Sequence, residues 1–485
     1  MQPRNYIDFK LYLTGAPNGA CQVALLPTPE VGESVTPVIV PAENGPSANL
    51  LPFVASKGIT LRKLVEFGKG LANWLLPTVS ADGQEPIRDL FVEALKRAGN
   101  EAGVRLRVII ADPTLKKWPW EYSYFDAFGV GGPDSMSGFL VLNPCVSIVR
   151  HEPLPHPHPA AKMTNTDLTE LRMVIAAASP KTQPKLDVDK EISYITKALK
   201  DFKVDNTRIT TIPIIDATLP EVAKALQGAD STCIFHFAGH GISEVTKQDP
   251  FSIGKTREEG FLYFLEDKNE KTEAKIRADD LASLLQAAGV RMAVFGACYS
   301  GMRSERYPWD SVAGALARRD IPAIITMQYE VYDAHATAFT GAFYGALAAG
   351  LSLDEAMTAG RLAMFALTSA QLDQTGFLEW GGPVLYSRLP DGKLFPERMN
   401  RTGPAAQQLR TTIQQTVTTI TSTGRVVGIK AKMVNGAFTV NQKVETVDGE
   451  LIGAELHEEG GSASIEQDIG KVSGNVTGLK LDKDI

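Results

Sequence analysis

The sequence has little cysteine, with four residues in a chain of 485. Cys21, Cys145, Cys233 and Cys298 are far apart, which excludes both a disulfide framework and the paired spacing of a zinc site. The chain also lacks any run of about 18 apolar residues, the length that a membrane-spanning helix needs. Its first ten residues contain no apolar segment typical of a secretion signal. These absences predict a soluble, cytoplasmic protein with reduced thiols and no membrane partner.

Long runs of one charge are also missing. The 49 Lys and Arg residues are balanced by 56 Asp and Glu residues, for a net charge of −7, and no basic cluster stands out. The sequence therefore predicts no nucleic-acid partner. With 44% hydrophobic and 22% charged residues, the composition excludes a wholly disordered or fibrous chain. The length is enough for about three domains of ~150 residues each.

The first 155 residues have the pattern of an α+β region. Apolar, β-prone segments at 6–14, 21–27 and 35–41 precede two amphipathic helical patterns and a strand at 104–110. A proline-rich stretch then begins at residue 153, where neither a helix nor a central strand is expected. We interpret residues 156–168 as an extended linker. Its histidines leave a metal site as the alternative, but we predict no metal and no cofactor.

Short apolar strands alternate with helical patterns between residues 169 and 396. This alternation is typical of a mostly parallel sheet with helices on both faces, so the predicted fold class is α/β. The expected strands are 171–177, 207–212, 232–237, 261–264, 292–295 and 323–327. The expected helices are 187–202, 218–227, 278–288, 310–319, 334–349 and 353–369, the last with a capping box formed by Ser352 and Glu355.

The composition changes after Pro404, since the remaining 81 residues contain no Pro, Trp, Tyr or Cys. Residues 435–456 align without gaps on 460–481, a shift of 25, and a third copy fits around 415–428. Glycines at fixed offsets among alternating apolar residues predict an all-β repeat module over 404–485. In each copy a glutamine sits between two apolar residues, so stacked copies would align these glutamines.

Two apolar strands end in small-residue turns that carry reactive side chains. Residues 232–241 (TCIFHFAGHG) end with His240 and Gly241, and residues 292–301 (MAVFGACYSG) contain Cys298. Reactive groups of open α/β sheets lie at the carboxyl ends of strands, so neighbouring strands would bring His240 and Cys298 together. A nearby imidazole promotes formation of the thiolate, which is the nucleophile. The backbone N–H groups of Gly241 and Cys298 could form an oxyanion hole. The pattern predicts acyl transfer, most simply peptide hydrolysis through a thioester.

Each residue also has a structural interpretation. Cys298 could be a small buried core residue, and His240 could be a satisfied turn histidine. Both His240 and Cys298 lie in glycine-containing turns at the ends of apolar strands, so we favour the Cys/His dyad. His236 lies inside its strand, four residues earlier, and we interpret it as structural. Cys233, at the start of the same strand, is expected in the core.

The two motifs, FAGHG at 237–241 and GACYSG at 296–301, resemble the CHAT family of caspase-like cysteine proteases, in the clan of caspases, separase and gingipain. The resemblance covers about residues 6–390. It includes the segments WPWE, SIVR, IPAIITMQ, AGRLA and WGGPVLY, which end at residues 121, 150, 328, 363 and 386. It implies a caspase-like sheet, with His240 as general base and acid and Cys298 as nucleophile.

The substrate pocket cannot be assigned from the resemblance. Relatives that cut after basic residues often carry an acid two positions before the cysteine, where this chain has Gly296. The nearest acids are Glu244, Asp310, Glu330 and Asp333. We expect Asp333 to be a helix N-cap rather than a specificity residue. The polar segments 243–259 and 299–309 are expected as loops beside the two turns, either as plain surface loops or as loops that change on activation.

The first functional hypothesis is a cysteine endopeptidase that cleaves a protein partner, and the resemblance implies a role in bacterial defence or regulated cell death. The alternative is an inactive caspase-like scaffold whose C-terminal repeats mediate recruitment or assembly. A weaker option is an acyltransferase with the same dyad. Residues 404–485 could recruit a sensor or effector protein, continue as an assembly into a second chain, or simply stabilise the protein.

Overall fold

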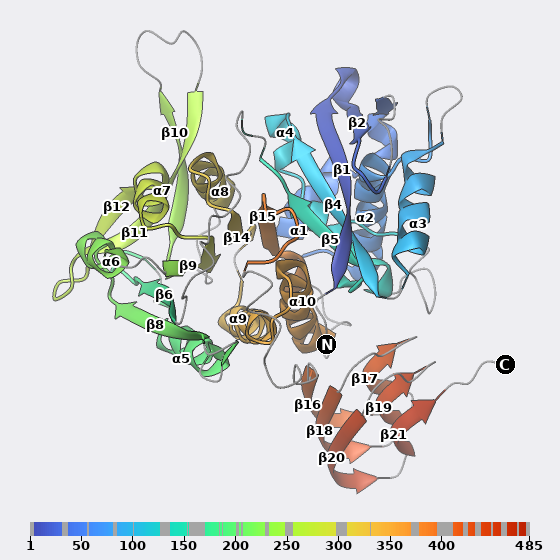
Figure 1. Ribbon diagram of the computed structural model, residues 1–485. Coiled ribbons are helices and arrows are strands. Elements are labelled where there is room, and N and C mark those ends of the chain that lie inside the picture. Colours follow the sequence, from blue (N-terminus) through green and yellow to red (C-terminus); the bar gives the residue numbers. More distant parts are fainter. Residues whose placement is uncertain are drawn as a thin grey trace.

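Figure 1 gives the computed structural model of the chain. Of the strands after residue 410, the structure describes the backbone alone. The residues described before that point are 4–31, 37–55, 58–80, 85–99, 101–126, 136–152, 154, 170–183, 185–186, 188–199, 203–204, 207–227, 232–247, 256–296, 308–329, 331–369 and 378–394. Those described after it are 411–420, 425–431, 438–447, 450–456, 463–472 and 475–481.

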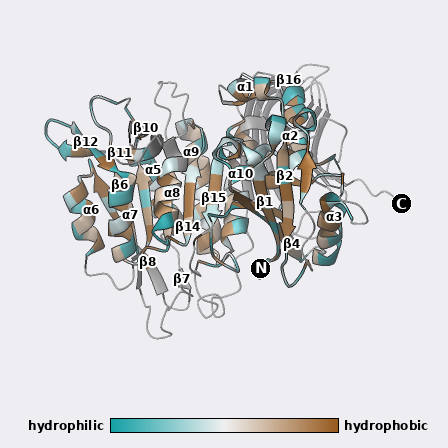
Figure 2. Ribbon diagram, turned by 90° about the horizontal axis from the view of Figure 1, so that it is seen from above, coloured by the Kyte–Doolittle hydropathy of each residue, from teal (hydrophilic) through white to brown (hydrophobic). Residues whose placement is uncertain are grey.

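Twelve of the described strands form one large sheet. Its centre is built from strands whose residues are all buried, so it is covered on both faces, and Figure 2 shows these strands as mostly hydrophobic. In spatial order they are β3 (Val38–Val40), β2 (Cys21–Leu26), β1 (Asn5–Gly15), β4 (Ala102–Ile110), β5 (Val146–Arg150), β15 (Pro383–Ser387), β14 (Ala323–Met327), β13 (Met292–Gly296), β9 (Thr232–Ala238), β6 (Glu170–Ala177), β8 (Thr207–Ile215) and β7 (Lys203–Val204).

The strand order places the helices on defined faces. From β6 the chain moves outward to β8 and then returns past β6 to β9, β13 and β14, with parallel pairing between β8, β6, β9, β13 and β14. Because such crossovers are right-handed, the outward and returning connections lie on opposite faces. One face carries α5 (Val188–Leu199), α9 (Asp333–Ala348) and α10 (Leu353–Ser369), and the other carries α6 (Leu219–Leu226), α7 (Ala278–Ala287) and α8 (Pro308–Arg318).

The first 150 residues contribute strands to the same sheet. Near its first edge, α2 (Leu61–Leu75) and α3 (Ile87–Ala98) pack against β1, β2 and β4, while α1 (Leu51–Ala55) and α4 (Pro113–Lys116) are short. The connection to the rest of the sheet is the pairing of Arg150 on β5 with Tyr386 on β15. The boundary that the sequence predicts at residue 155 lies along the chain between β5 and β6. These two strands are not neighbours in the sheet.

Buried polar groups reinforce this connection. Arg150 donates two hydrogen bonds to the Glu121 carboxylate, at 2.8 and 3.2 Å, and a third to Gln328 Oε1 at 3.1 Å. Gln328 in turn donates to Glu121 at 3.0 Å and to the carbonyl of Gly381 at 2.7 Å. Glu121 is fully buried, and a buried carboxylate needs such partners. The network holds the segments after β14 and before β15 against the N-terminal region.

The loop predicted at 243–259 is wrong at 243–247 and 256–259, which are strands, and residues 248–255 lie outside the described residues. A separate antiparallel sheet contains β10 (Gly241–Lys247), β11 (Thr256–Asp267) and β12 (Thr272–Arg277). The segment 261–264, expected as a strand of the large sheet, belongs to β11 instead. Hairpin pairing satisfies the backbone of this polar sequence, a long-range effect that side-chain polarity alone did not indicate.

The other described elements agree closely with the sequence. β14 and α10 have the predicted bounds, and the other predicted strands and helices of 170–369, apart from 261–264, differ at their ends by one to three residues. The short strand β7 was not predicted. Ser352 and Glu355 exchange hydrogen bonds of 2.9 to 3.3 Å, as a capping box requires. One correction concerns Asp333. It is the first helical residue of α9, and Tyr332 occupies the N-cap position.

The strands after residue 410 form two further three-stranded parallel sheets. One contains β16 (Thr411–Ile420), β18 (Phe438–Val447) and β20 (Ala463–Val472), and the other β17 (Arg425–Ala431), β19 (Glu450–Leu456) and β21 (Asn475–Leu481). Their register pairs Gln415 with Gln442 and Gln442 with Gln467. β16 lies beside α10, and the strands lie apart from the large sheet in Figure 1.

Among the helices that the structure describes, none is long and apolar enough to cross a membrane.

Candidate active site

The two motif strands, β9 and β13, are direct neighbours. They pair in parallel, with Phe237 opposite Phe295 and Ala238 opposite Gly296. His240 and Cys298 each come two residues after the last of these paired positions. Adjacent strands lie about 4.8 Å apart, so the two segments leave the sheet at the same edge and the same height.

This edge is also where the direction of the connections reverses. Connections from β6 lead away to β8, whereas those from β9 lead the other way to β13. Open α/β sheets bind ligands in the crevice outside the strand ends at such a reversal. His240 follows β9, one of the two strands that border it.

His240 is held in the turn between β9 and β10. Its side chain is buried, with 5% of the residue exposed, and its carbonyl accepts a hydrogen bond of 3.0 Å from the N–H of Tyr263 on β11. Gly241 and Leu262 are therefore opposite each other at a position that does not exchange hydrogen bonds. At such a position the N–H points away from the partner strand, so the Gly241 N–H is directed away from β11.

The other predicted site residues are only partly described. Cys298, Glu330 and the segment 299–307 lie outside the described residues, as do the side chains of Asp310 and Asp333. Glu244 is described. It lies on β10 and forms an ion pair with Lys275 of β12, with both side chains partly exposed.

Helix α8, which follows the cysteine segment, packs on the hairpin that follows His240. Ser243 on β10 and Ser311 on α8 share a hydrogen bond of 2.8 Å between their hydroxyls. Gly260 permits this close approach, because a Cβ there would lie 2.8 Å from Val312 Cγ2 and 2.9 Å from its backbone nitrogen. The chain three residues after His240 is thus in contact with the chain 13 residues after Cys298.

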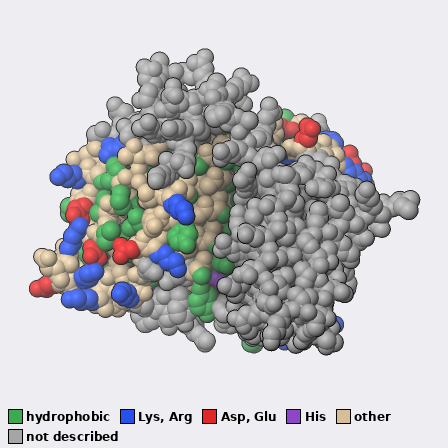
Figure 3. Space-filling model, turned by 90° about the horizontal axis from the view of Figure 1, so that it is seen from below, with side chains coloured by type: hydrophobic (Ala, Val, Ile, Leu, Met, Phe, Trp, Pro, Cys, Tyr) green, Lys and Arg blue, Asp and Glu red, His purple; other side chains and the backbone are tan. Residues whose placement is uncertain are grey.

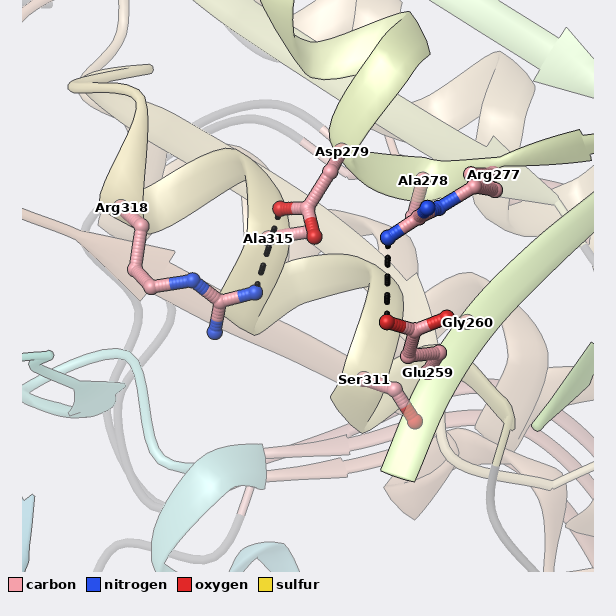
Figure 4. Close-up of a pocket in the computed structure, with 8 residues that line it drawn as sticks. All are labelled: Glu259, Gly260, Arg277, Ala278, Asp279, Ser311, Ala315 and Arg318. Carbon is pink, nitrogen blue, oxygen red and sulfur yellow. Dashed lines mark hydrogen bonds and ion pairs between the residues drawn. The ribbon is translucent and has the colours of Figure 1, made fainter. Parts of the chain in front are cut away.

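A small pocket lies beside this contact, shown in Figure 4. Two ion pairs cross it, Arg277 with Glu259 at 3.0 Å and Arg318 with Asp279 at 3.3 Å. The arginine side chains are half exposed, and their carboxylate partners are less so. The pocket's charged groups are thus paired with one another across the junction of β11, β12, α7 and α8.

A buried polar network lies deeper on β9. His236 Nε2 is 3.0 Å from Glu191 Oε1 of α5, and His236 Nδ1 is 3.0 Å from the Tyr344 hydroxyl of α9. His236 is 1% exposed, against 5% for His240. Sequence reasoning missed Glu191. The available signal was a carboxylate inside the apolar stripe of a helix, between Val188 and Ile195.

The surface of the described part carries charges of both signs. In Figure 3, Lys and Arg side chains are interspersed with Asp and Glu around patches of hydrophobic residues.

A family comparison covers most of this region. The CHAT domain model matches residues 65–388, which is more than half of the chain, so the protein belongs to the CHAT domain family. Together with the mostly parallel sheet flanked by helices, this membership gives the chain a caspase-like fold.

Comparisons with whole proteins find distant similarity only. No curated protein matches. Separase from Saccharomyces cerevisiae, solved with securin, is 11% identical with a TM-score of 0.38, covering 79% of this chain and 30% of the separase chain. The Arg-specific cysteine proteinase gingipain R is 14% identical with a TM-score of 0.37, covering 63% of this chain and 68% of that one. This chain thus spans less than a third of the separase chain.

Proposed function

We propose that the protein is a cysteine endopeptidase that cleaves a protein partner with a dyad of His240 and Cys298. The observation that carries this proposal is the register of β9 and β13. It gives His240 and Cys298 equal offsets from paired positions on neighbouring strands. A dyad needs an imidazole and a thiol within hydrogen-bond reach, and equal offsets on adjacent strands favour this.

The proposed reaction has two steps. His240 takes the thiol proton of Cys298, and the sulfur attacks the carbonyl carbon of the scissile peptide bond. His240 then gives that proton to the departing amine, which leaves a thioester. Water, activated by the same imidazole, hydrolyses the thioester and restores the thiol.

Backbone groups would stabilise the oxyanion that forms in each step. The Gly241 N–H points away from β11, which supports its role as one donor, with the Cys298 N–H as the second. One such donor contributes about 3 kcal/mol to transition-state stabilisation in other enzymes. Neither donor depends on a metal or cofactor.

The substrate pocket is proposed to contain acidic residues. Glu244, Asp310, Glu330 and Asp333 are the candidate acids, and Glu244 is already paired with Lys275. We also propose a role in bacterial defence or regulated cell death, which membership of the CHAT domain family supports.

A second proposal concerns residues 404–485, which we assign to recruitment or assembly. The in-register parallel pairing of three successive copies supports a repeat module that satisfies its own backbone hydrogen bonds. The strands at the ends of such a stack offer backbone groups to a strand from a sensor or effector protein, or from a second copy. If the dyad were inactive, recruitment or assembly by this module would be the function of the protein.

The test is limited proteolysis of candidate partners. Wild-type protein and the Cys298→Ala variant are incubated with proteins encoded by neighbouring genes, and new N-termini are sequenced. We expect specific new N-termini with the wild type alone. Identical patterns with both proteins would reject the endopeptidase and favour the scaffold.

A further inference from the structure

One buried network contacts both strands that lead to the proposed dyad. His236 is on β9, four residues before His240, and it connects Glu191 of α5 with Tyr344 of α9. Glu191 also reaches β13. A Cβ placed on Gly296 would lie 2.9 Å from Glu191 Oε1. Gly296 is two residues before Cys298.

The hydrogen bonds of this network are mutually consistent. A carboxylate oxygen accepts, so the His236 Nε2–H donates the hydrogen bond to Glu191 Oε1. The Tyr344 hydroxyl lies 3.0 Å from the other ring nitrogen, Nδ1, so both nitrogens of His236 have a partner. Glu191 and His236 are 4% and 1% exposed, and buried polar networks whose members are satisfied are rigid.

The contact with Gly296 depends on that rigidity. Contacts of a Cβ below about 3 Å are not tolerated, so a side chain at position 296 would have to displace the Glu191 carboxylate. The end of a glutamate side chain is normally easy to move. Here the displaced oxygen is the one that accepts from His236, so moving it breaks the bond to β9.

We infer that Glu191 is a positioning residue of the active site. Its carboxylate is bound to His236, whose ring is bound in turn to Tyr344. The carboxylate thereby holds the ends of β9 and β13 in one alignment and sets the separation of the imidazole and the thiol. Misplacement of reacting groups by about 1 Å can cost about a hundredfold in rate. Position 296 is glycine because the carboxylate comes from α5 and occupies the space that a side chain there would fill.

This inference rests on the proposed function, so its test begins with the dyad. A fluorogenic peptide is selected from a library by its hydrolysis with wild-type protein, and Cys298→Ala provides the background. Wild-type activity equal to that background would reject the proposed function itself. Wild-type activity above the Cys298→Ala background allows Glu191 to be tested separately. Each rate is then divided by the concentration of active sites, which is titrated with a thiol-directed peptidyl ketone.

The variants separate positioning from folding. We expect Glu191→Ala to lower kcat at least tenfold with KM within about twofold, and Glu191→Gln, which keeps the shape and an acceptor oxygen, to lose less. Tyr344→Phe removes one hydrogen bond, keeps the ring, and should lower kcat severalfold. Asp189→Asn, an exposed acid on the same helix, is the matched control and should be unchanged.

A double-mutant cycle tests the contact with β13. Gly296→Ala should lower kcat at least tenfold in the wild type, and less than twofold when added to Glu191→Ala, because the colliding oxygen is then absent. A residue that only stabilises the fold would leave kcat per titrated site unchanged. That result, or equal effects of Gly296→Ala in both backgrounds, would overturn the inference. If Glu191→Ala does not fold, the same decision rests on Glu191→Gln and Tyr344→Phe: unchanged kcat in both would overturn it.

Discussion

Replacing Asp354 with alanine should destabilise the protein strongly. Arg105 on β4 forms a two-pronged pair with Asp354 at the start of α10, with Nε to Oδ1 at 2.9 Å and Nη2 to Oδ2 at 2.6 Å. The side chains are 2% and 1% exposed. Arg105 also contacts Asp8 at 3.1 Å, so the variant leaves a buried guanidinium with one carboxylate instead of two. Removal of one partner of a buried pair costs about 3–5 kcal/mol.

The pH dependence of this loss has a defined sign. Burial alone would raise the pKa of Asp354, but the charge and hydrogen bonds of Arg105 and a hydrogen bond from Ser147 outweigh it, so the pKa lies below its ordinary value. A depressed carboxyl pKa contributes stability above the unfolded-state pKa of about 4, and that stability disappears as the pH falls through the folded-state pKa. The difference between wild type and variant should therefore be full at pH 7 and shrink below about pH 4.

Urea unfolding followed by tryptophan fluorescence measures this difference. Trp74, Trp118, Trp120 and Trp380 all lie close to the N-terminal half of the sheet and report on it. The control is Asp126→Ala, whose partner Lys69 and own side chain are 40% and 65% exposed, and which should cost less than about 1 kcal/mol. A loss below 1 kcal/mol for Asp354→Ala, or the same loss at pH 3 and pH 7, would refute the argument.

Three further predictions test other parts of the molecule. Trp120→Ala should lower the free energy of unfolding by about 3–5 kcal/mol, because the ring is fully buried and its N–H donates to the Leu115 carbonyl at 3.1 Å; a loss under 1 kcal/mol in urea unfolding would contradict this. Cys21 should resist iodoacetamide at pH 8 until the protein is unfolded, because burial, with a smaller effect of the Asp112 charge, raises its thiol pKa to about 12; peptide mapping of an adduct on the native protein would disprove it. Truncation after Arg401 should preserve peptide hydrolysis and reduce cleavage of the natural partner, and equal loss of both activities would show that residues 404–485 support the catalytic fold.

Local patterns in the sequence were enough to predict most of the large sheet. Apolar runs between turn residues located the strands of 170–327, and the capping box located the start of α10. The same logic brought His240 and Cys298 to strand ends. Periodicity does not encode chain topology, so it could not predict that β9 and β13 are neighbours. The structure provides both their pairing and their register.

What the sequence could not predict depends on long-range partners. The polar segment 243–247 forms a strand because β11 pairs with it, although its composition is typical of a loop. The sequence around Glu191 is that of an ordinary acid on a helix. Its role depends on His236 and Gly296, which lie beside it in the fold but 45 and 105 residues further along the chain. Likewise, the partners of Glu121 are Arg150 and Gln328, which lie 29 and 207 residues further along the chain.

The most direct test of the proposed dyad is covalent labelling. A peptidyl acyloxymethyl ketone, which reacts with an activated thiol in a substrate-binding site, is added to wild type, His240→Ala and Cys145→Ala, and the adduct is located by peptide mass spectrometry. We predict one adduct, on Cys298, formed equally by wild type and Cys145→Ala and reduced at least a hundredfold in His240→Ala. Labelling of Cys298 that does not depend on His240, or no labelling of Cys298 in the wild type, would contradict the assignment of these two residues as the catalytic pair.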